Sequence, residues 1–247
     1  MDVLKRDFLL DDLRPLMAQH GIEGLVTVQA SQTVRETEWL LDLATRHGEI
    51  RGVVGWVPLV EPDVGATLER LAANPRLRGV RHVLQDEPDD DFALRDDFNR
   101  GVAQLRRHGL VYDILIYERH LPQAIALVDR HPDQVFVLDH IAKPRIRDRE
   151  LSPWRERIRE LARREHVYCK ISGMVTEADW ATWTEADLAP YLDVVLEAFG
   201  PKRLMFGSDW PVLLLAGDYG RWVDIVRRAI APLSGDERAW IERRTAI

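Results

Sequence analysis

The sequence predicts an α/β protein built from repeated strand–helix units, of the eight-fold β/α (TIM) barrel class. Strand-like and helix-like segments alternate from one end of the 247-residue chain to the other, with no interior linker. Such repeats imply a parallel sheet. No glycine-rich dinucleotide fingerprint follows the first strand, so an open sheet of that kind is disfavoured. The length fits one large domain, and we expect a single domain over residues 1–247.

Seven segments have the continuous apolar and β-branched composition that is typical of buried strands. They cover residues 24–30, 52–59, 77–84, 111–117, 135–139, 167–172 and 203–208. An eight-fold barrel needs eight strands, and the deficit lies at the front, where residues 7–21 have the pattern of a helix. We therefore expect this chain to lack the first barrel strand.

Helices are predicted where apolar residues recur at helical spacing and where Gly, Pro or polar residues mark the ends. The expected helices after the opening one are residues 34–47, 64–73, 92–108, 121–131, 153–164, 185–199, 219–230 and 237–244. Ser234 and Glu237 have the spacing of a capping box for the last of them.

Composition excludes several classes of function. The net charge of -7 leaves no basic surplus to meet phosphates, so we expect no nucleic-acid partner. No apolar run approaches the roughly 20 residues that cross a bilayer, and residues 1–7 do not resemble a signal peptide. The single cysteine, Cys169, excludes an internal disulfide and is expected to be a small buried apolar residue. We expect a cytoplasmic protein with no membrane partner.

Asp209 is the strongest candidate for a functional residue. It stands in Phe-Gly-Ser-Asp-Trp-Pro, residues 206–211, at the point where a buried strand ends. In barrels of parallel strands the catalytic groups gather at the carboxyl ends of the strands. We interpret Asp209 as a general base or metal ligand. The alternative is a cap on a turn that begins at Trp210, since Asp favours such positions.

His140 follows Asp139 at the end of another apolar strand. An imidazole there can act as a ligand, a proton shuttle or an oxyanion donor. A histidine buried in the core is the alternative. Asp139 is expected to orient a neighbour or bind backbone. Lys143, in the loop above, is a candidate for contact with an anionic substrate or a developing oxyanion, against the alternative of a solvated lysine.

Other strand-end side chains are candidate substrate contacts. Arg81 and His82 close one strand, and an arginine at a barrel mouth suits a polar ligand oxygen, although a salt bridge at the rim is equally consistent. The remaining candidate pocket residues are Gln29, Trp56, Tyr112 and Tyr117. Trp180 and Trp183 could stack on a sugar-like ring, against the alternative of a lid or a core filler. Lys170 lies among apolar neighbours, so it would be buried and would need a partner, for which Asp209 and Asp113 are candidates.

Five segments together closely resemble the amidohydrolase-related lactonases, a group that includes L-fuconolactonase, L-rhamnonolactonase and 2-pyrone-4,6-dicarboxylate lactonase. They are GVVGWVPL at 52–59, RGVRH at 78–82, LDHIAKP at 138–144, CKISG at 169–173 and FGSDWP at 206–211. The resemblance covers nearly the whole chain in the same motif order. The sugar-lactone branch is closer than the pyrone branch.

The resemblance implies a distorted β/α barrel that opens a lactone ring with water. The family's aspartate after the last strand, which acts as base or binds a divalent metal, corresponds to Asp209. Its histidine in the Asp-His element, which polarises the carbonyl or contacts the metal, corresponds to His140. The family's first strand ends in His-x-His, for which this sequence has no counterpart. Zinc usually takes three protein ligands, so His140 and Asp209 alone predict weak or absent zinc binding.

The leading hypothesis is hydrolysis of an L-fuconolactone-type or L-rhamnonolactone-type sugar-acid lactone, a step of carbohydrate catabolism. Two other functions stay open. One is an impaired barrel that acts as a binding or assembly protein, since a missing strand leaves a sheet edge through which copies could form a homo-oligomer. The other is decarboxylation, which related barrels perform with similar ligands. No Gly-x-Ser-x-Gly elbow, phosphate loop, His-x-His or His-Glu-x-x-His occurs in the chain.

Overall fold

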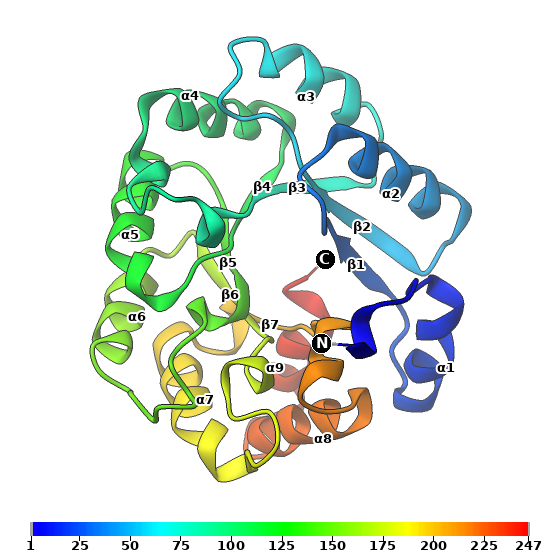
Figure 1. The fold of residues 1–247 in the computed structure, drawn as a ribbon, viewed down its shortest axis with the longest axis vertical. Coiled ribbons are helices and arrows are strands. Elements are labelled where there is room, and N and C mark those ends of the chain that lie inside the picture. The colour runs from blue at the N-terminus through cyan, green and yellow to red at the C-terminus, as the bar shows by residue number, and fades with distance from the viewer. Residues whose placement is uncertain (1, 247) are drawn as a thin grey trace. The chain divides into compact units, whose positions relative to one another are not determined.

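The computed structural model describes residues 2–246 and confirms an α/β fold with parallel strands (Figure 1). The chain divides into two compact units. The first unit comprises Met1–Glu23, Asp139–Arg163 and Tyr168–Ile247, and the second unit comprises Gly24–Leu138 and Arg164–Val167. The prediction of one domain over residues 1–247 remains a prediction. No helix in the described part of the chain is both long enough and apolar enough to cross a membrane.

The second unit contains parallel strands that pair in sequence order. They are β1 (Leu25–Val28), β2 (Ile50–Gly55), β3 (Leu77–His82), β4 (Val111–Ile114) and β5 (Phe136–Leu138). Its α-helices are α2 (Val34–Arg46), α3 (Val64–Ala72), α4 (Asp96–Leu105) and α5 (Leu121–Arg130). Short 3₁₀ turns occupy η2 (Leu84–Asp86), η3 (Phe92–Leu94), η4 (Arg106–His108) and η5 (Glu118–His120).

The first unit contains β7 (Leu204–Phe206) and β6 (Val167–Ile171), apart from the first residue of β6. Its α-helices are α1 (Leu10–His20), α6 (Trp154–Ala162), α7 (Glu185–Phe199), α8 (Tyr219–Ile230) and α9 (Gly235–Ala239), and a π-helical turn, η10 (Trp240–Arg244), follows α9. The short turns are η1 (Asp2–Leu4), η6 (Asp139–Ala142), η7 (Val175–Glu177), η8 (Pro201–Arg203) and η9 (Val212–Leu215).

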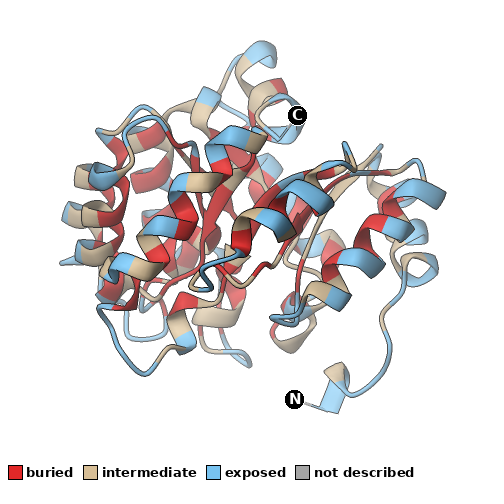
Figure 2. Ribbon diagram, turned by 90° about the horizontal axis from the view of Figure 1, so that it is seen from above, coloured by how far each residue is buried: buried red, intermediate tan, exposed pale blue. Residues whose placement is uncertain are grey.

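The helices are amphipathic, with buried residues along one side and exposed residues along the other (Figure 2). In α8, Trp222, Val223, Val226 and Ile230 are buried at helical spacing, and the Asp218 carboxylate caps the helix by accepting from the Arg221 amide at 2.8 Å. The predicted capping box is confirmed. The Ser234 amide donates to Glu237 at 2.8 Å, and the Glu237 amide donates to the Ser234 hydroxyl at 3.3 Å.

The prediction of one helix over residues 92–108 is wrong. The chain forms η3, then α4, then η4, because Arg95 between the first two is extended, with φ -61° and ψ 141°. The Asn99 side-chain amide donates to the Ala93 carbonyl at 2.9 Å and so satisfies an acceptor that a continuous helix would have used. The predicted helix at 237–244 likewise divides, into α9 and the π-helical turn.

The register of β6 on β7 sets the geometry of the first unit. Ile171 pairs with Phe206, and the Gly207 amide donates to the Ile171 carbonyl at 3.1 Å. The residues that follow the two strands, Ser172 and Gly207, therefore leave the sheet side by side. Within residues 2–246, the first strand along the chain is β1. The expectation that the chain lacks the first strand of the barrel stays a prediction.

Two helical glycines of the second unit give a matched test of packing. A Cβ at Gly101 in α4 would overlap the Leu59 backbone carbonyl, whereas a Cβ at Gly65 in α3 would meet only the end of the flexible Gln104 side chain. We expect Gly101→Ala to destabilise the fold by about 1–3 kcal/mol. Gly65→Ala should be neutral or stabilising by up to about 1 kcal/mol, because alanine is the better helix former. Urea unfolding measures both, and equal effects of the two substitutions would contradict this packing.

Candidate active site

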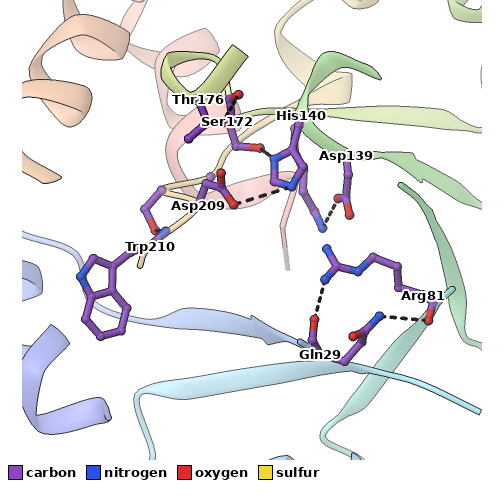
Figure 3. Close-up of polar contacts among 12 residues, drawn as sticks. Gln29, Arg81, Asp139, His140, Ser172, Thr176, Asp209 and Trp210 are labelled. Atoms are coloured by element: carbon purple, nitrogen blue, oxygen red, sulfur yellow. Dashed lines mark hydrogen bonds and ion pairs between the residues drawn. The ribbon is translucent and has the colours of Figure 1, made fainter. Parts of the chain in front are cut away.

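The structure brings His140 and Asp209 together in the first unit. His140 Nε2 lies 3.7 Å from Asp209 Oδ1, and the two side chains are 12% and 15% exposed (Figure 3). The two residues are 69 positions apart in the sequence; His140 lies in η6, after β5, and Asp209 lies in the loop after β7. Their convergence is the observation on which the hydrolytic hypothesis depends. Their catalytic roles remain predictions.

Both residues have unusual backbone conformations. Asp209 has φ 55°, and His140 begins a run of four left-handed residues that continues through Lys143. The Lys143 amide closes this turn on the His140 carbonyl at 2.8 Å, and the indole of Trp154, which is fully buried in α6, donates to the Ile141 carbonyl at 2.8 Å. Left-handed conformations cost non-glycine residues about 1–3 kcal/mol and cluster at functional sites. The backbone conformations that orient these two side chains therefore lower the stability of the fold locally.

The Asp209 carboxylate faces the imidazole, while its backbone carbonyl accepts the turn hydrogen bond from the Leu213 amide at 3.0 Å. The indole of Trp210 points away from the imidazole and meets Phe8 edge-on, with ring centroids 5.3 Å apart (Figure 3). The functional role of Asp209 and the alternative of a turn cap both remain predictions.

The other nitrogen of His140 has a defined partner. Nδ1 lies 2.8 Å from the hydroxyl of Ser172, which is buried at the end of β6. The pattern Lys-x-Ser-Gly in the sequence contained this residue, but no local signal tied it to His140. The pairing depends on where β6 lies relative to η6, and so it was not predicted.

An ion pair between a partly exposed lysine and a fully buried carboxylate lies beside this hydrogen bond. Lys170 Nζ is 2.7 Å from Oδ1 of Asp139, which is fully buried. The sequence predicted a buried lysine in need of a carboxylate and proposed Asp209 or Asp113; the structure supplies Asp139. Because an unpaired charge in this position would cost several kcal/mol, the pair holds Asp139 and Lys170 to one arrangement.

Glu177, in η7, is a further acidic residue that sequence reasoning missed. Burial raises the pKa of its carboxyl, the nearby Lys143 ammonium opposes this shift, and the Asp209 carboxylate adds to it. Lys143 and Asp209 thus act on one carboxyl, which places the predicted Lys143 in the same electrostatic neighbourhood as the candidate base. Its contact with a substrate stays a prediction.

The two tryptophans considered for stacking differ. Trp180 is 43% exposed and donates to the Thr176 carbonyl at 2.9 Å, so a face of its ring remains available. Trp183 is buried, donates to the Ala216 carbonyl at 2.6 Å and has the Arg221 guanidinium 3.7 Å from its ring centroid. Trp183 is therefore a core residue, and Trp180 remains a candidate substrate contact.

The second unit holds the other predicted substrate contacts. Arg81 donates to the Gln29 carbonyl and accepts, through its own carbonyl, from the Gln29 side chain at 3.5 Å (Figure 3). Trp56 Nε1 donates to Nδ1 of His82 at 3.3 Å. Tyr117 is half-buried and has the Arg119 guanidinium 5.0 Å from its ring centroid.

His82 is engaged at both ring nitrogens, because Nε2 lies 2.6 Å from Glu87. Its ring stacks on Phe92, with centroids 5.0 Å apart. Burial lowers the pKa of His82, and Glu87 opposes that shift. The substrate roles of Arg81, His82, Trp56 and Tyr117 remain predictions. Cys169 is buried, as expected, and burial raises the pKa of its thiol far above the usual value.

The donor set offers two ligands of the type that zinc prefers. Imidazole nitrogen and carboxylate oxygen bind zinc at about 2.0–2.2 Å, so two atoms 3.7 Å apart can share one ion. Zinc-bound imidazoles hydrogen-bond through their other nitrogen, as His140 does to Ser172. Within residues 2–246, no group of three or more His, Cys, Asp or Glu side chains is arranged to hold a metal ion.

Comparison with known proteins identifies the family of this chain. The amidohydrolase family model matches residues 2–247, and the chain belongs to that family. It is 45% identical to an L-fucono-1,5-lactonase of Burkholderia multivorans, with 100% of this chain and 86% of the relative covered. A second L-fucono-1,5-lactonase, from Burkholderia ambifaria, is 40% identical over 90% of this chain and 78% of its own length. The resemblance inferred from the five motifs is confirmed.

A solved structure of an amidohydrolase from Burkholderia multivorans with bound zinc superposes with a TM-score of 0.94. It is 45% identical to this chain and covers 100% of it, and this chain covers 89% of that structure.

Gly173 provides a test of how tightly His140 is held. Its φ is +63°, and an added Cβ would lie 2.7 Å from Cβ, Cγ and Nδ1 of His140. Gly109 has φ +65° with nothing within 4 Å of an added Cβ. We expect both alanine variants to lose the roughly 1–2 kcal/mol of the left-handed conformation, and Gly173→Ala to lose about 1–3 kcal/mol more through overpacking. Equal losses in urea unfolding would show that the imidazole does not press on Gly173.

The raised pKa of Glu177 predicts a pH dependence of stability. Its contribution is fully present below the unfolded pKa of about 4.3 and is lost as pH rises through the folded value. Glutamine does not ionise, so the stability of Glu177→Gln relative to the parent should rise between about pH 4 and pH 8, as the Glu177 carboxyl of the parent loses its proton. Glu185→Gln is the control of opposite sign, because the Arg228 hydrogen bond lowers the pKa of Glu185. Urea unfolding across this range measures both, and parallel pH profiles for Glu177→Gln and its parent would rule the effect out.

Proposed function

We propose that this amidohydrolase hydrolyses a sugar-acid lactone of the L-fucono-1,5-lactone type. The observation that carries the proposal is the facing pair of Asp209 and His140, 3.7 Å apart and shielded from solvent. The 45% and 40% identities to L-fucono-1,5-lactonases support lactone hydrolysis as the reaction. The alternative of an impaired barrel that only binds or assembles finds no support among these relatives.

In the proposed reaction, Asp209 takes a proton from water as the oxygen attacks the lactone carbonyl carbon. The carbonyl oxygen becomes an oxyanion, to which the His140 imidazole donates a hydrogen bond. A preorganised donor of this kind lowers a barrier by about 3–4 kcal/mol. The ring carbon–oxygen bond then breaks, and Asp209 returns the proton to the leaving ring oxygen. The product is the open-chain hydroxy acid.

Lys143 is proposed to strengthen this electrostatic environment. Its effect on the Glu177 pKa indicates that the ammonium acts on the same group of carboxyls as Asp209. A cation there favours the developing oxyanion and the carboxylate product. Trp180, with an exposed indole, is proposed to cover a face of the sugar ring, and Arg81, His82, Trp56 and Tyr117 are proposed to contact the substrate.

A divalent metal is a candidate cofactor. The zinc in the 45% identical amidohydrolase supports it, and His140 and Asp209 are the residues that would hold it. When bound, such an ion polarises a carbonyl or lowers the pKa of water. We further propose that the parallel strands belong to a β/α barrel and that the chain works as a single domain, for which the match of the family model over residues 2–247 is the support.

Replacement of Asp209 tests the proposal. Asp209→Asn should lower kcat/KM for L-fucono-1,5-lactone by about 10²–10⁴-fold, since general base catalysis contributes that much. Asp218→Asn is the matched control: the carboxylate caps α8, and asparagine caps as well as aspartate, so stability and activity should be retained. Proton release measured with a pH indicator reports turnover, and urea unfolding reports the fold. A folded Asp209→Asn variant with parental turnover would eliminate Asp209 as the base.

A further inference from the structure

One face of β6 is directed at the Asp139–His140 segment. Side chains alternate across a strand, and Val167, Cys169 and Ile171 are all fully buried on one side. Lys170 and Ser172 belong to the opposite side. Lys170 pairs with Asp139 at 2.7 Å, and Ser172 pairs with His140 at 2.8 Å. Lys170 of β6 and Ser172, which directly follows the strand, therefore hold two consecutive residues of η6.

The Ser172 hydroxyl is fixed on its far side. An added Cβ at Gly207 would lie 2.8 Å from Ser172 Cβ and 3.1 Å from its Oγ, so the backbone of the neighbouring segment closes against this side chain. Ser172 is 1% exposed, and so bulk water does not compete for its hydroxyl. Its Oγ has one defined position, beside Nδ1 of the imidazole.

The imidazole is confined as well. Gly173 lies against its Cβ, Cγ and Nδ1, at the distance where no other residue would fit. The left-handed turn that starts at His140 fixes where its Cα–Cβ bond points. One choice is left open by packing alone: which ring nitrogen carries the proton. A serine hydroxyl can donate or accept, but the Asp209 carboxylate that faces Nε2 only accepts, which assigns the proton to Nε2 and the acceptor role to Nδ1.

We propose that Ser172 is the positioning residue of His140: its hydroxyl donates to Nδ1 and so stabilises, together with Asp209, the tautomer that carries its proton on Nε2 and directs Nε2 to Asp209. This inference rests on the proposed function only for its kinetic consequence. The hydroxyl does not touch the reacting atoms. Without the Ser172 hydroxyl, Nδ1 loses its donor and the tautomer with the proton on Nδ1 becomes accessible; that tautomer has no Nε2–H to donate to the oxyanion.

Two readouts test the role of Ser172. In the full-length protein labelled with ¹⁵N-histidine, the His140 resonances, assigned by comparison with His140→Gln, should report a single tautomer. Ser172→Ala should show a mixture of tautomers, with kcat for L-fucono-1,5-lactone reduced about 10- to 100-fold and KM changed less than about threefold, as for other residues that orient a catalytic histidine. Ser172→Cys, nearly equal in size and a weak hydrogen-bond partner, should fall between the two.

Thr176→Ala is the matched control. Its hydroxyl lies in the same segment but donates to the Gly173 carbonyl at 2.9 Å. The control should keep the single tautomer and kcat within about threefold. A single unchanged tautomer in Ser172→Ala or, if that variant does not fold, in Ser172→Cys overturns the proposal, as does parental kcat. If the parent protein turns over no lactone, the proposed function fails, while the tautomer measurement still decides the role of Ser172.

Discussion

The pairing of β6 with β7 is the constraint on which the candidate site depends. Ile171 and Phe206 are register partners, so the chain leaves both strands at one level, through Ser172 on one side and Gly207 on the other. Two residues after Gly207, the left-handed backbone of Asp209 directs its carboxylate to His140. A slip of one residue in this register would turn Ser172 away from the imidazole, because side chains alternate across a strand.

Glycine is required at two points around this register for different reasons. Gly173 allows a left-handed backbone and the contact of the imidazole with the main chain, whereas Gly207 has an ordinary backbone and is needed for the space that Ser172 fills. The motifs Lys-x-Ser-Gly and Phe-Gly-Ser-Asp are therefore partners in one packing arrangement. Each supplies one glycine and one polar group to the surroundings of His140.

The carboxyl groups of Asp139, Asp209 and Glu177 in the first unit have different partners. Asp139 is paired with Lys170 and is buried, so it is committed to structure. Asp209 faces an imidazole and retains limited solvent exposure, which suits a group that exchanges protons with substrate. Glu177 adds a third carboxyl, which burial biases towards its protonated form. The three carboxyls thus have different electrostatic surroundings because their partners and their burial differ.

The sequence by itself determined the order of strands and helices, since apolar runs and helical periodicity are local properties of the chain. It also determined the family, through five motifs, and the two residues most worth attention, because a polar group directly after a buried strand is conspicuous. Its errors lie where local patterns are ambiguous, as at Arg95, where one extended residue divides a predicted helix.

Only the tertiary structure decided which side chains meet. The bond of Ser172 to His140, the pairing of Asp139 with Lys170 and the proximity of Glu177 to Asp209 all join residues from separate elements. Such contacts depend on strand register and on the left-handed turn at His140, and neither can be read from local composition. The physical reason is that a hydrogen bond needs atoms within about 3 Å, a precision that only the packed sheet and its loops provide.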